Sequence, residues 1–373
     1  MSARRTADDF HGARLRLARA FHGWTQADLG SQVGVKHQFV GYLEAGFKRP
    51  SAMLLDALVD LTGFTHGFFE EPLVEEFRDE ECHFRRRQTT PVAMRNRLLA
   101  HGTLFGSLVG YLDEALQLPA DDVPEARVQG AEAIEEAAER CRARWNLGPD
   151  APLANVLRVI ERAGVVVTAL EGHADKIDAF SRAGRRKVMV LNRDKGSASR
   201  RNFDLAHELG HLVMHGGMDT DSPEIEAEAD RFASAFLLPR RGFLAEFPRG
   251  PKLDWEPLVN FQRRWRVSLA AIVRRAYALR LSDAAHYQRA YKFMSAQGWL
   301  RGGEPAEPPS PEPEVVSLAF ASLANDHGVT ATEVARHLHW RFDILERVAG
   351  VALEGTHETP APRAVVVQLD LFR

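Results

Sequence analysis

The chain has 373 residues, of which 45% are hydrophobic and 27% are charged, and its formal net charge is −3. This composition excludes an intrinsically disordered chain, and the length suggests two or three domains of ordinary size. The near-neutral total gives no overall sign of nucleic-acid binding. The first fifty residues differ, because they hold eight Lys/Arg against four Asp/Glu, a balance that suits contact with phosphate groups.

The cysteines and the apolar segments of the sequence indicate in which cellular compartment the protein is expected. Its two cysteines, Cys82 and Cys141, lie far apart and lack metal-ligand spacing, so we expect no disulfide framework and a reducing, cytoplasmic environment. No apolar run approaches the roughly 20 residues that a membrane helix needs. The start, MSARRTADDFHG, lacks the apolar core of a signal peptide. We therefore expect no membrane partner.

Residues 1–72 predict a first domain of short helices. The stretch TQADLGSQVG (25–34) has Thr25 as a candidate N-cap and Gly34 as a stop. KHQFVGYLEAG (36–46) predicts the next helix, and SAMLLDALVDLTG (51–63) has apolar residues at helical spacing. The segment WTQADLGSQVGVKHQFVGYLEAGFKRPS resembles the XRE-type, phage-repressor-like helix-turn-helix domain, through Thr25-Gln26, Leu29, Gly34, Leu43-Glu44, Gly46 and Pro50.

The resemblance implies a reader of double-stranded operator DNA. In such a module the second of two packed helices enters the major groove, which would expose Lys36, His37 and Gln38, with Tyr42 one turn further on. A glutamine can bind adenine in a bidentate manner, and a lysine can contact phosphate or guanine. Gln26 resembles the phosphate-contacting glutamine of the family. One unit reads too few base pairs to be selective, so we expect a homodimer on two half-sites.

An alternative for this domain is a protein-interaction module that has lost DNA binding. Phe39 and Gly41 stand where small polar residues are more usual in the family, which favours that alternative.

Residues 73–150 predict an all-helical connector or dimerisation segment. Its helices are expected over MRNRLLAHGTLFGSLVGYLDEAL and EARVQGAEAIEEAAERCRARW, and the run Arg85-Arg86-Arg87 is interpreted as a solvated turn.

The pattern changes in residues 151–301. GVVVTAL (164–170), IDAFSR (177–182) and KVMVLNR (187–193) predict short strands, and the second and third could form a hairpin. The stretch VMVLN is either an edge strand able to pair with an extended peptide or an internal strand. GGEPAEPPSPEPE (302–314) predicts a Pro-rich linker, and 315–373 a C-terminal helical domain that ends in a strand over 363–373. The fold class is therefore α+β and mostly helical.

The stretch RRNFDLAHELGHLVMHGG (200–217) contains the pattern H-E-x-x-H. On a helix His207 and His211 are four residues apart and face the same side, so both can bind one zinc ion. Glu208 projects from nearly the same edge and can accept a proton from a water molecule beside the ion. His215 lies one turn beyond, but the chain before it lacks the Gly that would let it bend toward the metal. We therefore expect His215 to contact a ligand side chain or the substrate rather than the metal itself.

A catalytic zinc ion needs a third protein ligand, and SPEIEAEADRFASAFLLP (222–239) predicts the helix that supplies it. We favour Glu226, with Glu224 and Glu228 as alternatives. Asp230 follows Glu226 at helical spacing. Its carboxylate can orient a histidine by accepting a hydrogen bond from the ring nitrogen that does not bind the metal. The other explanation for these acids is an acidic helix N-terminus favoured by the helix dipole.

NFDLAHELGHLVMHGG followed by EAEADRFASAFLLP, with DAFSR and RKVMVLNRD ahead of them, resembles the ImmA/IrrE family of zinc metallopeptidases. The resemblance implies a gluzincin-like endopeptidase with zinc bound by His207, His211 and Glu226 and with Glu208 as the base. Family members are associated with cleavage of helix-turn-helix repressors in phage, mobile-element or stress control. The sequence departs from the family at Asn202 and Asp204, where Arg and Thr are frequent.

These observations lead to a hypothesis of function. The chain is expected to be a DNA-binding transcriptional regulator whose zinc endopeptidase domain cleaves a regulatory protein, either a partner repressor, a toxin or antitoxin, or itself. The alternative is a non-proteolytic DNA-binding repressor or antitoxin whose zinc domain is structural or sensory. The residue that stabilises the oxyanion is open, with Arg200, Arg201 and His215 as candidates.

Overall fold

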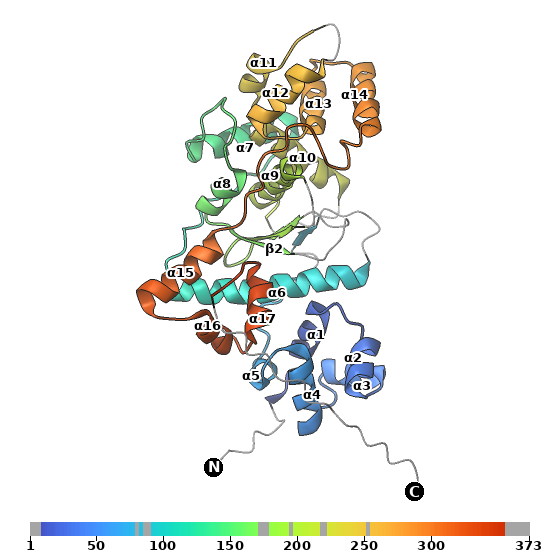
Figure 1. Ribbon diagram of the computed structural model, residues 1–373, viewed down its shortest axis with the longest axis vertical. Coiled ribbons are helices and arrows are strands. Elements are labelled where there is room, and N and C mark those ends of the chain that lie inside the picture. The colour runs from blue at the N-terminus through green and yellow to red at the C-terminus, as the bar shows by residue number, and fades with distance from the viewer. Residues whose placement is uncertain are drawn as a thin grey trace.

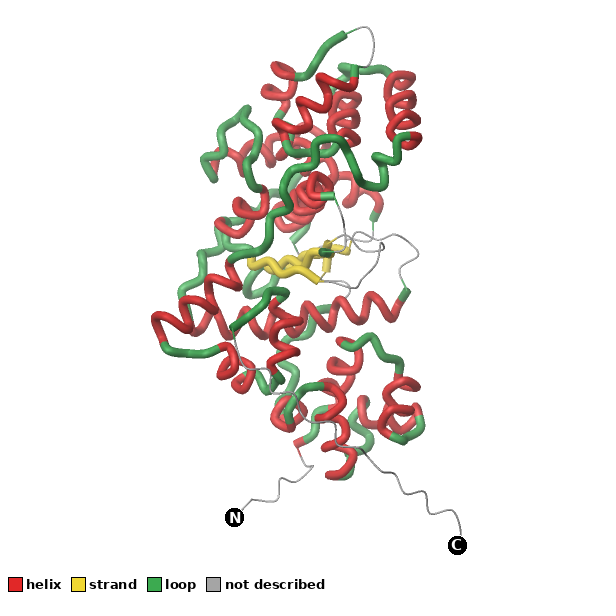
Figure 2. The backbone as a smooth tube through the Cα atoms, in the orientation of Figure 1, coloured by secondary structure: helices red, strands yellow, loops and turns green. Residues whose placement is uncertain are grey.

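The computed structural model describes residues 9–78, 82–84, 91–170, 179–193, 197–216, 222–250 and 254–354. Within these ranges a small sheet lies in the middle of a mostly helical chain, as Figure 2 shows, which confirms the α+β prediction. No helix in the described part of the chain is both long and apolar enough to cross a membrane. The Arg85-Arg86-Arg87 run and the strand predicted over 363–373 lie outside the described residues.

The N-terminal part of the chain up to residue 72, called the head below, contains five short helices. The predicted caps are present: the Thr25 side chain accepts a hydrogen bond from Asp28 N in a capping box, and Ser51 accepts one from Leu54 N. Gly34 ends the second helix with φ 75°, a conformation that costs glycine little. The helices are α1 (Gly12–Phe21), α2 (Gln26–Val33), α3 (His37–Glu44), α4 (Ala52–Thr62) and α5 (His66–Glu70).

A 24-residue helix, α6 (Val92–Ala115), crosses the molecule between the head and the sheet (Figure 1). The connector 73–150 was predicted to be all-helical, and this is wrong in two places. Residues 82–84 form a strand, β1 (Cys82–Phe84), and residues 125–129, expected at the start of the second connector helix, are not helical. The next helix is α7 (Gly130–Arg144).

The described sheet has four strands in the order β1-β3-β4-β2, where β2 is Val166–Leu170, β3 is Ala179–Arg182 and β4 is Val188–Asn192. The predicted hairpin is confirmed, because β3 and β4 pair antiparallel, while β2 and β4 run parallel. The edge-strand interpretation of VMVLN is wrong, since β4 has β3 on one side and β2 on the other. Both faces of β2 and β4 are buried, which explains their unbroken apolar sequences.

The two faces of the sheet belong to two different hydrophobic cores, because successive strand residues point to opposite sides. One core contains Val167, Met189 and Leu191 and is covered by the helices that Figure 1 shows above the sheet. Those helices are α7, α8 (Val156–Arg162), α9 (Ala198–Met214), α10 (Pro223–Leu237), α11 (Arg240–Glu246), α12 (Trp255–Trp265), α13 (Leu269–Ala278) and α14 (Ala284–Ala296).

The other core joins the head, α6 and the C-terminal helices into one unit. It contains Leu15 of α1, Phe105 of α6 and Val190 of the sheet. It also contains apolar residues of α15 (Val315–His327), α16 (Ala331–His337) and α17 (Phe342–Ala349). This core therefore continues across residues 72 and 315, where domain boundaries were predicted.

Main-chain hydrogen bonds tie the head directly to the C-terminal helices. Thr65 N donates to His339 O at 2.9 Å, and Arg341 N donates to Gly63 O at 2.8 Å. On the sheet side, Thr168 of β2 donates from its hydroxyl to Ala349 O at 2.9 Å. The C-terminal helices thus bridge the head and the sheet.

Residues 302–314, predicted as a Pro-rich linker, contain none of the named helices or strands, yet hydrogen bonds attach them to the helices above the sheet. The carboxylate of Glu304 is buried and accepts hydrogen bonds from Gln262 Nε2 and Leu269 N. The carboxylate of Glu307 accepts hydrogen bonds from Ser199 N and from the hydroxyls of Ser197 and Ser199. This places a negative charge at the N-terminus of α9, where the helix dipole favours it.

Candidate metal centre

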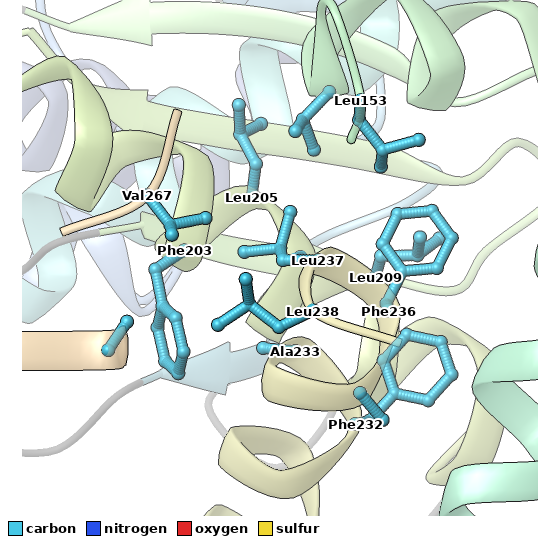
Figure 3. Close-up of a cluster of buried hydrophobic side chains, with 14 of the residues drawn as sticks. Leu153, Phe203, Leu205, Leu209, Phe232, Ala233, Phe236, Leu237, Leu238 and Val267 are labelled. Atoms are coloured by element: carbon cyan, nitrogen blue, oxygen red, sulfur yellow. The ribbon is translucent and has the colours of Figure 1, made fainter. Parts of the chain in front are cut away.

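Two helices, α9 and α10, build the candidate centre. Ser197 caps the start of α9, and Ser222 caps α10 with Pro223 at its first position. Figure 3 shows Leu209 of α9 among the α10 side chains Phe232 and Phe236. Gly210 lies tightly against the ring of Phe232, because a Cβ there would be 3.0 Å from Phe232 Cδ1, closer than most Cβ contacts. The Gly within H-E-x-x-H therefore has a packing role.

The predicted ligand residues meet between these helices. The Nε2 atoms of His207 and His211 lie 3.0 Å apart, and the Glu226 carboxylate oxygens lie 3.5 Å from the first and 3.3 Å from the second. The donor atoms of all three residues fall within 4.8 Å of one another. Two nitrogens bound to one tetrahedral zinc ion at 2.0–2.1 Å would be roughly 3.3 Å apart, so the arrangement fits such an ion.

The hydrogen-bond partners of the two imidazoles indicate which nitrogen of each ring carries a proton. His207 Nδ1 donates to Asp230 Oδ1 at 2.9 Å, which leaves its Nε2 lone pair directed at the cluster. On the other ring, His215 Nε2 donates to Glu228 at 3.1 Å, so His215 Nδ1 can accept from His211 Nδ1 at 3.0 Å. Both Nε2 atoms then present lone pairs, as metal binding requires.

The three acids of α10 that the sequence left as alternatives for the third ligand have different partners in the structure. Glu228 is hydrogen-bonded to His215, and Glu224 accepts a hydrogen bond from the Ser222 hydroxyl at 2.7 Å. Neither joins the three donor groups within 4.8 Å, which include Glu226 alone among the acids of α10. His215 lies behind His211, on its Nδ1 side, rather than among the converging Nε2 atoms.

Glu208 has a partner that sequence reasoning did not identify. Its carboxylate Oε2 accepts a hydrogen bond from the hydroxyl of Ser181 at 2.6 Å, and both residues are buried, at 1% and 0% exposure. Ser181 lies in β3, so the strand positions the glutamate of the neighbouring helix. The available signal was a hydroxyl in a strand whose neighbours, Ala179 and Phe180, are apolar.

A second residue missed from the sequence is Arg274 of α13. Its Nη1 donates to Asp230 Oδ2 at 3.0 Å, while the other Asp230 oxygen holds His207. Arg200 and Arg201, considered for the oxyanion, are engaged elsewhere: Arg200 donates to Trp299 O, and Arg201 donates to Ser310. The carboxylate of Asp230 thus links His207, a candidate ligand, to a cation on another helix.

Burial sets the protonation of the centre. Burial raises the pKa of Glu208 to about 8, although His207 and the Ser181 hydroxyl act in the opposite direction. Burial lowers the pKa of His211 to about 4, so its ring is neutral near pH 7. For Glu226 burial opposes ionisation, but the neighbouring imidazoles of His207 and His211 outweigh it and lower its pKa to about 2. A neutral imidazole and an ionised carboxylate are the forms that bind a metal ion.

In the head, α3 presents the residues predicted to contact DNA. Lys36, His37, Gln38 and Tyr42 are exposed, with Tyr42 at 51%, while Val40 and Leu43 of the same helix are buried. Gln26 is half-buried, and its amide donates to Glu44 Oε2 at 2.7 Å.

One part of this face lies next to α6. Gln26 and His37 line a hollow together with Val92, Ala93 and Asn96 at the start of α6. The beginning of α6 therefore borders the predicted DNA-contacting face of the head.

Comparison with known protein families agrees with the two resemblances. Residues 160–277 match the IrrE N-terminal-like domain, a peptidase family, and residues 12–67 match a helix-turn-helix domain. The predicted combination of these two domains is confirmed. No curated protein matches the chain.

Proposed function

We propose that this chain, which joins an N-terminal helix-turn-helix domain to an IrrE N-terminal-like peptidase domain, is a DNA-binding regulator that cleaves a regulatory protein by zinc-dependent hydrolysis. The observation that carries the proposal is the convergence of two imidazole Nε2 atoms and one carboxylate beside a buried glutamate. Two histidines, one glutamate and an adjacent acid are the set that a gluzincin-like endopeptidase uses.

Each residue of the centre has a separate task. His207, His211 and Glu226 would hold the zinc ion, which supplies a Lewis acid that lowers the pKa of a water molecule toward neutrality. In its ionised form Glu208 would accept the proton of the attacking water and return it to the amine that leaves. Asp230 fixes the ring orientation of His207, and His215 does the same for His211.

The head supports a regulatory role for the peptidase. The exposed polar residues of α3 are available to bases and phosphates of an operator, and the expected state on DNA is a homodimer. A protein that both reads an operator and cleaves peptide bonds fits a gene switch. The substrate class we propose is a helix-turn-helix repressor or a toxin–antitoxin partner, cut in trans or within the chain itself.

The test uses the purified full chain, zinc and the product of the neighbouring gene, followed by mapping of new protein termini. The wild-type protein is expected to hold about one zinc ion per chain and to produce defined fragments. Glu208→Gln should keep the zinc and lose cleavage, whereas His211→Ala should lose both. Glu224→Gln, on the same helix as Glu226 but outside the cluster, serves as the control and should behave as wild type. Cleavage that persists in a zinc-loaded Glu208→Gln protein would exclude this mechanism.

A second candidate function is a repressor or antitoxin that binds DNA and does not cleave. The observation in its favour is the burial of His207, Glu208 and His211, which are each at most 1% exposed. In this case the metal site would be structural or sensory. Promoter binding and a normal regulatory response in Glu208→Ala, together with no cleavage by the wild type, would favour it.

A further inference from the structure

The strand of the sheet nearest to the candidate base is β3, and its outer edge is covered by a strand from outside the peptidase domain. Ser181 of β3 donates to Glu208, so the strand and the glutamate are in direct contact. β3 uses one edge to pair with β4 and the other to pair with β1, antiparallel, in the register Cys82↔Arg182, His83↔Ser181 and Phe84↔Phe180. β1 belongs to the connector between α5 and α6.

The other edge of the sheet is not equivalent. β2 lies two strands away from β3, and its residues are packed against the end of α17. Thr168 of β2 donates to Ala349 O, and a Cβ on Gly350 would lie 2.5 Å from Ala169 O. Within the described sheet, the outer edge of β3 is therefore the edge next to the candidate metal centre.

We infer that the outer edge of β3 is the docking edge for an extended peptide substrate, and that residues 82–84 occupy this edge in cis until the substrate displaces them. The inference rests on the proposed function and adds how the substrate binds. Main-chain hydrogen bonds along a free strand edge bind extended peptides with little demand on sequence. The pairing of β1 covers three of the four residues of β3, so a peptide strand that follows the whole edge can pair with Ala179 as well.

The connector is anchored just before β1. Phe77 N donates to the Thr103 hydroxyl of α6 at 2.9 Å, and Glu75 accepts a hydrogen bond from Arg182 at 2.6 Å. Glu76 accepts one from Arg16 of α1 at 2.9 Å. These contacts keep the start of β1 close to the edge, which gives it the advantage of an intramolecular competitor. They also mean that β1 can leave β3 while the chain stays attached through Phe77.

Displacement of β1 can be tested without hydrolysis. The protein is the full chain carrying Glu208→Gln, and the probe is a fluorescein-labelled synthetic peptide with the sequence RDEECHFRRRQ, which is that of residues 78–88. The test variant carries His83→Pro together with Phe84→Pro; successive main-chain N–H groups of a strand face opposite sides, so one of the two removed donors faces β3 and its loss weakens the pairing. Val74→Pro places proline in the same connector at an exposed residue outside β1 and serves as the matched control.

The expected result is that the peptide binds the test variant about tenfold or more tightly than it binds the parent or the Val74→Pro protein. Hydrogen exchange of the β3 amides should be slow in the parent, faster in the test variant, and slow again when the peptide is added. Equal affinity in all three proteins, including no binding to any, would overturn the inference. So would an unchanged exchange rate of β3 in the test variant.

A second variant keeps the inference testable if the proline changes disturb folding. Arg182→Cys places a thiol directly opposite Cys82, so oxidation should lock β1 onto β3. The oxidised protein should bind no peptide and the reduced protein should bind it. Equal peptide binding by the oxidised and the reduced protein would refute the inference. If the peptide behaves as expected but no variant with an intact Glu208 cleaves any partner, the proposed peptidase function fails alone.

Discussion

The link between Asp230 and His207 gives the sharpest quantitative prediction. Asp230→Asn keeps the side-chain volume and one oxygen to accept the hydrogen bond from His207 Nδ1, but removes the negative charge. Changes in groups that orient a ligand histidine usually weaken metal binding roughly 10–100-fold, or about 1.4–2.7 kcal/mol. The Arg274 guanidinium, 3.0 Å from the other oxygen, already offsets part of that charge, so we expect the lower half of this range for Asn. Asp230→Ala, which also removes the acceptor, should reach the upper half.

The assay is competition for zinc between the metal-free protein and a chromogenic chelator at constant pH. The head offers a matched control, because Asp56 accepts a hydrogen bond from His66 at 2.7 Å and lies away from the centre. Asp56→Asn should leave zinc affinity unchanged. An Asp230→Asn protein that folds normally and binds zinc within about twofold of wild type would refute the role assigned to Asp230.

Three further predictions concern stability and DNA binding. Glu135 and Arg275 form a buried ion pair, so Glu135→Gln should lower the free energy of unfolding by about 3–5 kcal/mol in urea titrations, and a loss below about 1 kcal/mol would contradict the pairing. Burial raises the pKa of Glu304 to about 7, so the folded chain keeps a proton that the unfolded chain releases above about pH 4.5. The free energy of unfolding should therefore fall by about 3 kcal/mol between pH 4.5 and 7, and Glu304→Gln should flatten this fall. Gln38→Ala should reduce discrimination between operator bases by about 1–3 kcal/mol in competition binding, while Lys36→Ala should weaken all duplexes and lower the salt dependence.

Local signals in the sequence were sufficient for the helices that carry the centre. The spacing of His207 and His211, and the capped start of α10, each depend on residues within one or two turns. The head was equally predictable, since Thr25, Gly34 and Ser51 act within their own helices.

Long-range pairings account for what the sequence did not reveal. A strand of three residues is too short for a period-two pattern, so β1 could not be recognised before its partner β3 was known. The position of β4 inside the sheet also depends on strand order, which its own apolar residues do not encode. Ser181 and Arg274 reach the centre from elements 27 and 44 residues away from their partners Glu208 and Asp230.

The shared core of the head and the C-terminal helices has a consequence for a broken chain. Leu15 of the head and Phe105 of α6 lie in one core. Main-chain hydrogen bonds from Thr65 to His339 and from Arg341 to Gly63 also link the head to the C-terminal helices. A single cut in the connector between α5 and α6 would therefore yield two fragments that stay associated, as in fragment complementation. The head would remain seated beside the peptidase domain after the covalent link was lost. Self-cleavage in the connector would thus not by itself release the head from the rest of the protein, and a separate protein is the more effective target for such a switch.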